Sequence, residues 1–173
     1  MKSFFVRLDG LLRKLSLLGF LAASGLILLV GLMGAADVVS TNLFRKPIPG
    51  MVELSGALLG VIVFLGLAEA QARGTNIVID VSTQKMGPRM LRYATLFSLL
   101  LGIGFMGMVA WETSRLTFAA WRIGEEALGA LAFPMTPFKA VAAFGAWLAV
   151  AEFARQFVRA AVGVDPAGTA KRD

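Results

Sequence analysis

Four long apolar runs, separated by short segments that carry most of the charge, dominate this sequence of 173 residues. A helix that crosses a bilayer needs about 20 mainly apolar residues, because it rises about 1.5 Å per residue through a hydrocarbon layer of about 30 Å. Each run meets this length. The sequence therefore predicts an all-α integral membrane protein, a single domain over residues 1–160 with a flexible tail over 161–173. The expected spans are residues 15–36, 51–72, 93–111 and 134–157.

The distribution of positive charge predicts how these spans are oriented. The five segments from the N-terminal end to the C-terminal end hold four, two, four, three and four lysines and arginines. Richer and poorer segments alternate, and segments rich in positive charge stay in the cytoplasm. We therefore expect both termini and the second connection to be cytoplasmic, in a multi-pass protein of a bacterial inner membrane.

The three connections carry different signals. Pro47 and Pro49 cannot lie inside a continuing helix, so the first connection is a rigid reversal. The second, residues 73–92, is too apolar for a free linker; a short interfacial helix and an ordered loop packed on a partner are both open. The third, residues 112–133, is expected to contain helix that either extends the third span or folds against the outer surface.

Composition removes most catalytic chemistry. The chain has no cysteine and no histidine, which excludes thiolate and imidazole ligands and the usual general base near neutral pH. We expect no enzyme activity, no cofactor and no metal. The net charge of +6 is spread in small groups between apolar runs, so no nucleic-acid surface is predicted.

Three acids in or near the spans are the sharpest polar signal. A charged side chain in hydrocarbon costs about 2.5–3.5 kcal/mol, so Glu53, Glu69 and Glu152 need partners or water. Sixteen residues separate Glu53 from Glu69, which places them on nearly opposite helix faces. For Glu152, an ion pair with Arg155 at i,i+3 is one reading. For the other two, we favour contact with another polypeptide over interfacial solvation or an ion path.

Small residues in the second span indicate close packing. Gly56-x-x-x-Gly60 lets two helices approach closely in lipid. The partner helix is expected either within this chain or in another subunit.

The stretches Asp37–Leu54 and Ala68–Asp80 resemble the small membrane subunit of TRAP transporters, the DctQ-like family. Thr41 stands where the family often has arginine, and Asn76 where it usually has histidine, so any role that needs a cation at these two positions is in doubt. The positions that match the family pattern are Asp37, Phe44, Pro47, Pro49, Gly50, Glu53, Ala70, Gly74, Ile77 and Asp80.

This resemblance implies a subunit that braces a large membrane subunit and helps dock a periplasmic substrate-binding protein, in sodium-coupled uptake of organic acids. Membrane lipids are the other expected contact. An autonomous small carrier or channel, or an anchor subunit of another membrane complex, is the alternative. The candidate partner-interface residues are Arg45, Lys46, Pro47, Pro49, Gly50, Glu53, Gly56, Gly60, Glu69, Asn76, Asp80 and Glu152.

Overall fold

A computed structural model describes residues 2–73, 87–129 and 131–162, and shows four long helices. They are α1 (Lys2–Phe44), α2 (Met51–Ala72), α4 (Pro88–Ile123) and α5 (Thr136–Val162). All four are long and apolar enough to cross a membrane. Over the described residues the expected all-helical fold is therefore confirmed, with four helices able to span a membrane.

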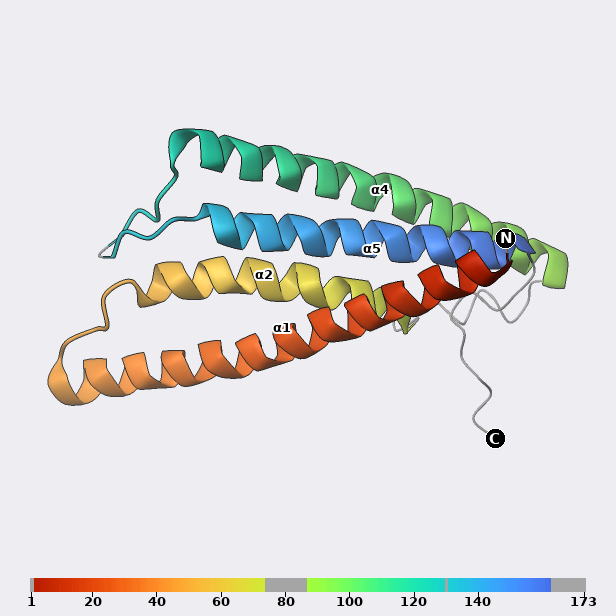
Figure 1. Ribbon diagram of the computed structural model, residues 1–173. Helices are drawn as coiled ribbons and strands as arrows, with labels where there is room; N and C mark the ends of the chain where they lie inside the picture. The colour runs from red at the N-terminus through yellow and green to blue at the C-terminus, as the bar shows by residue number, and fades with distance from the viewer. Residues whose placement is uncertain (1, 74–86, 130, 163–173) are drawn as a thin grey trace.

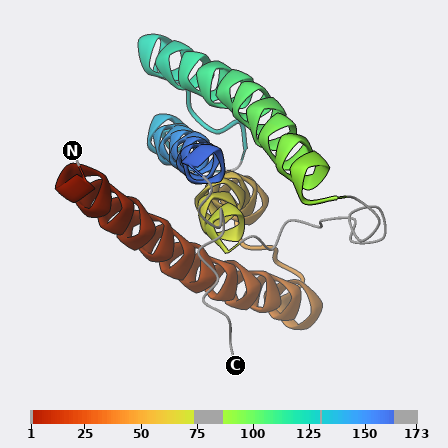
Figure 2. The same cartoon turned by 90° about the vertical axis from the view of Figure 1, so that its right-hand side faces the viewer.

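The helices lie in a row, with α2 and α5 in the middle and α1 and α4 on the outside (Figure 1). Neighbours in the row pack against each other, in the order α1, α2, α5, α4, and α1 also touches α5. The end-on view of Figure 2 shows the same order. Because α1 and α4 each have a neighbour on one side only, they bury less of their surface than the two central helices.

Both outer helices are longer than the apolar runs that predicted them. α1 has 43 residues and α4 has 36, which correspond to lengths of about 64 and about 54 Å at 1.5 Å per residue. Each exceeds a hydrocarbon layer of about 30 Å, so both extend beyond it. The helix expected in the third connection is present as the last turns of α4, which ends at Gly124 in the left-handed conformation (φ 62°). The described residues that follow are not helical before α5 begins.

The start of α1 and the end of α5 lie at the same end of the row (Figure 1). The α1–α2 turn and the α4–α5 hairpin lie at the other end, which we call the hairpin end. This agrees with an even number of crossings. Which end faces the cytoplasm stays a prediction, as do the interfacial helix and the flexible tail, which fall largely outside the described residues.

Two apolar clusters hold the middle of the row together. One joins α1 to α2 through Ala23, Val61, Ile62 and Leu65. The other joins α2, α4 and α5 through Ala68, Met106, Leu148 and Ala149. Both clusters use alanines and medium-sized aliphatic side chains, which let the helices approach closely where lipid supplies no hydrophobic driving force.

Candidate functional site

The α1–α2 turn at the hairpin end is fixed by hydrogen bonds from the end of α1. The Ile48 backbone N–H donates to Asp37 Oδ1 at 2.7 Å, and Ser40 Oγ donates to the Lys46 carbonyl at 2.7 Å. Arg45 adopts a positive φ of 51°, which lets the chain leave the helix at once. The expected rigid reversal is therefore present. In addition to its prolines, the hydrogen bonds of Asp37 and Ser40 hold it, and we call the bond from Ile48 to Asp37 the Asp37 clamp.

Loss of the Asp37 clamp should loosen this turn. Asp37→Ala removes a charge-assisted hydrogen bond at a partly exposed site, a loss of about 1 kcal/mol. Tryptic cleavage after Arg45 in the detergent-solubilised chain is expected to accelerate about fivefold, which is the population change that this energy produces. Asp37→Asn keeps an acceptor oxygen and should cleave at nearly the wild-type rate. Equal rates for Asp37→Ala and wild type would show that the clamp does not hold the turn.

The turn also packs against the α4–α5 hairpin. Gly50 is buried with φ 76°, and a Cβ there would lie 2.6 Å from Leu131 Cβ. A Cβ on Gly129 would lie 1.8 Å from Glu53 Oε1, so this carboxylate rests directly on the hairpin backbone. Two connections that are far apart in sequence therefore form one surface at the hairpin end.

Glu53 borders a depression of about 640 Å³ between the start of α2 and the hairpin. Glu125 at its edge is paired with Lys139 at 2.6 Å. Glu53 is half-buried and makes no hydrogen bond or ion pair to any residue in the described part of the chain. Its negative charge is therefore left for water or for another polypeptide.

The glycines of the Gly56-x-x-x-Gly60 motif make no close helix contact in the described part of the chain. A Cβ added at either glycine would meet no atom within 4 Å. The motif lies on a stripe of α2 that also exposes Val52, Leu59 and Val63, and Gly56 borders the depression beside the hairpin. Packing of these glycines against a helix of another subunit stays a prediction.

Other glycines make the close contacts inside the chain. A Cβ on Gly145 of α5 would lie 2.7 Å from the backbone carbonyl of Phe64 on α2. Gly102 of α4 faces the Phe153 ring on α5, and Gly19 of α1 faces the Leu65 carbonyl on α2. None of these glycines has a second glycine four residues away, although Ala23 follows Gly19 and Ala149 follows Gly145 at that spacing. Many small residues line the fourth span, and their spacing alone does not show which of them touches a backbone.

The end of the row opposite the hairpin carries a buried ionic network. The Glu152 side chain is fully buried and paired with Arg155, whose Nε is 3.0 and 2.9 Å from the two carboxylate oxygens. Arg155 Nη1 also donates to Asp9 Oδ1 of α1 at 2.7 Å, and Arg159 Nη1 lies 3.2 Å from Asp9 Oδ2. The predicted pair between Glu152 and Arg155 is confirmed, whereas the link to Asp9 was not predicted.

Polar side chains from α2 complete this end. Gln71 Nε2 donates to Gln156 Oε1 at 2.8 Å, and Gln156 Nε2 donates to the Gln71 carbonyl at 2.6 Å. Glu69 is buried, and its Oε1 lies 2.8 Å from Arg73 Nε. One oxygen of Glu69 therefore has a partner four residues away, the C-cap residue Arg73. The other oxygen, Oε2, is buried and makes no hydrogen bond within the described residues, so contact of Glu69 with another polypeptide stays a prediction.

The remaining interface candidates lie in two places. Arg45, Lys46, Pro47 and Pro49 are exposed in the α1–α2 turn. Asn76 and Asp80 lie outside the described residues. Within the described ranges, no three acidic side chains are grouped so that they could hold a metal ion. The described part of the site consists of an exposed turn, an unpaired carboxylate beside a depression, and structural ion pairs at the other end of the row.

Four helices long and apolar enough to span a membrane, lying in a single row with exposed apolar faces, define a multi-pass membrane protein. Residues 27–163 match the family model described as tripartite ATP-independent periplasmic transporters, DctQ component. This match covers most of the chain, so the chain belongs to that family and is a membrane subunit of a transporter. A comparison with curated proteins finds no match.

Proposed function

We propose that this chain is the small subunit that braces the large membrane subunit of a TRAP transporter in a bacterial inner membrane. In this role it also helps to dock the substrate-binding protein during sodium-coupled uptake of organic acids. The observation that carries the bracing role is the open Gly56/Gly60 stripe on α2. A small-x-x-x-small stripe that meets no helix in the described residues offers a helix of another subunit a close approach.

The arrangement of polar groups argues against an autonomous carrier or channel. A transport path needs polar side chains along its depth. The buried polar residues of the described chain are Ser16, Glu69, Gln71, Glu152 and Gln156. All belong to the end opposite the hairpin, where most of them pair with one another or with arginines. The hairpin half of the row has an apolar interior, so an ion or organic acid would find no continuous polar route.

The hairpin end supports the docking role. Glu53 presents an unpaired carboxylate beside the packed turn, and Arg45 and Lys46 are exposed on the same turn. The charge distribution along the sequence predicts that this end faces the periplasm. Charged side chains on a rigid turn steer and orient a soluble partner.

The bracing role is tested by substitution in the open stripe. Gly56→Leu and Gly60→Leu should leave the isolated chain folded, since both positions have free space. They should reduce copurification of the large membrane subunit about tenfold or more, a loss of about 1.4 kcal/mol. Gly31→Leu makes the same change at an exposed position of α1 with equally free space, and should copurify like wild type.

Two results would contradict the proposal. One is retention of the large subunit by both stripe variants at the wild-type level. The other is uptake of an organic acid by liposomes that contain this chain alone, which would establish the carrier alternative.

A further inference from the structure

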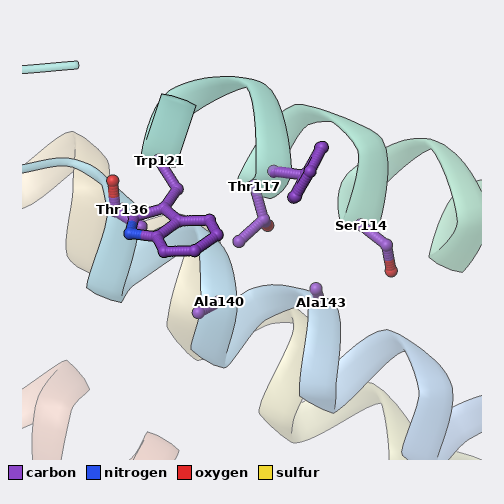
Figure 3. A pocket seen from close by; sticks show the side chains of 7 residues that line it. Ser114, Thr117, Trp121, Thr136, Ala140 and Ala143 are labelled. Atoms are coloured by element: carbon purple, nitrogen blue, oxygen red, sulfur yellow. The ribbon is translucent and has the colours of Figure 1, made fainter. Parts of the chain in front are cut away.

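A groove of about 420 Å³ separates α4 from α5 near the hairpin end (Figure 3). Its size lies within the range of small-molecule sites. In Figure 3 the side chains of Trp121 and Thr117 reach from α4 toward Ala140 and Ala143 of α5. The small side chains of the two alanines leave the groove open. Its lining residues are Ser114, Thr117, Phe118, Trp121, Thr136, Ala140 and Ala143.

The hydroxyl groups on the α4 side of the groove are already satisfied. Thr117 Oγ1 donates to the Thr113 carbonyl at 2.8 Å. Ser114 Oγ donates to the Ala110 carbonyl at 2.7 Å and accepts from Trp147 Nε1 at 3.0 Å. The groove therefore offers mainly methyl groups and ring faces, which suit an apolar occupant.

The groove is short. The hydrogen bond between Trp147 and Ser114 joins α4 to α5 at one end, and Trp121 stands at the other end. The seven helical steps from Ser114 to Trp121 rise about 10 Å. A packed helix from another subunit needs a longer groove, because its ridges run over several turns. A narrow, flexible chain fits this length.

A cation lies next to the groove. Arg122 follows Trp121, and its guanidinium carbon lies 4.5 Å from the centre of the Phe118 ring. In the described part of the chain Arg122 has no carboxylate partner, whereas Arg115 pairs with Glu112 at 3.0 Å. A guanidinium binds phosphate through two parallel hydrogen bonds. Tryptophan prefers the level of the lipid headgroups, so the groove lies at the depth where phosphates occur.

We propose that this groove binds one glycerophospholipid, with an acyl chain between α4 and α5 and its phosphate on Arg122. The lipid would fill the gap at the edge of the row and hold the outer turns of α4 against α5. This inference does not depend on the transporter role, because it uses only contacts within this chain.

The test uses the full chain in detergent, titrated with palmitoyl-oleoyl phosphatidylglycerol and analysed by native mass spectrometry. Wild type should retain one lipid. Ala140→Leu fills the groove from an exposed position and should weaken binding at least about tenfold. Arg122→Gln should weaken it about tenfold, the value of one charge-assisted contact. Ala119→Leu makes the same change as Ala140→Leu on the exposed surface of α4, outside the groove, and should bind like wild type.

Thr117→Leu fills the groove from the α4 side and should also lose the lipid. Because this substitution lies on α4, a loss of binding in both variants is not explained by misfolding of α5 in Ala140→Leu alone. Wild-type retention by both groove-filling variants would overturn the proposal, as would equal affinity of Arg122→Gln and wild type. A photoreactive residue at position 140 in native membranes should label phospholipid. Labelling of a protein subunit there would assign the groove to a polypeptide and overturn the lipid site.

Discussion

Replacing Arg155 by methionine is expected to lower the free energy of unfolding by about 3–5 kcal/mol, the cost of leaving one partner of a buried ion pair alone. Glu152 is fully buried and receives the Arg155 guanidinium on both oxygens. Methionine fills a similar volume but leaves this carboxylate without a cation. The same change removes the salt bridge between Arg155 and Asp9, which joins α5 to the beginning of α1. Unfolding of the detergent-solubilised chain, followed by circular dichroism, measures the loss.

Two variants separate this charge effect from a general loss of packing. Arg115→Met breaks an exposed pair with Glu112 and should cost no more than about 1 kcal/mol. The double variant Glu152→Gln/Arg155→Met removes both charges and should be more stable than Arg155→Met alone, because no buried charge is left without a partner. If the double variant were as unstable as the single one, the loss would come from shape, and the electrostatic explanation would fail.

Substitution of Gly145 by alanine should lower the free energy of unfolding by about 1–3 kcal/mol, as expected for overpacking. The added Cβ would lie 2.7 Å from the backbone carbonyl of Phe64 and 2.9 Å from the Leu65 nitrogen. Backbone atoms inside a helix cannot rotate away, so α2 and α5 must separate. These are the two central helices, and their separation disturbs the whole row. The same unfolding measurement applies.

Two other glycines provide the comparison. Gly104→Ala adds a methyl group where no atom lies within 4 Å, and should leave stability nearly unchanged. Gly102→Ala would bring a Cβ 2.4 Å from Phe153 Cε1, but a ring at the end of a side chain can turn aside, so an intermediate loss is expected. The steric account is wrong if Gly145→Ala proves no less stable than Gly104→Ala.

Sequence reasoning predicted local features well. The pair between Glu152 and Arg155 spans less than one helical turn, so spacing alone was enough to suggest it. The reversal at Pro47 followed from backbone chemistry, and the resemblance of Asp37–Leu54 to the DctQ-like family agrees with the family match. Glu69 is only partly explained in this way, because Arg73 at i,i+4 pairs with Oε1 while the buried Oε2 has no hydrogen-bond partner in the described residues.

Long-range contacts were not predicted. Asp9 and Arg155 are 146 residues apart, and nothing near either residue identifies the other as its partner. The Gly56/Gly60 motif predicts close helix packing, but its spacing does not say which helix it faces, and no described helix meets it. Gly145, which has an alanine and no second glycine four residues away, makes the close backbone contact.

The sequence alone determined that this chain has four segments long and apolar enough to cross a membrane, because hydrocarbon acts on each segment separately and length with polarity decides the outcome. It also determined that cysteine and histidine chemistry is excluded. Only the tertiary structure decided the order of helices in the row, the glycines that touch a backbone and the open stripe on α2. Those features depend on how faces of separate helices fit together, since lipid covers any apolar face equally well and hydropathy does not distinguish one from another.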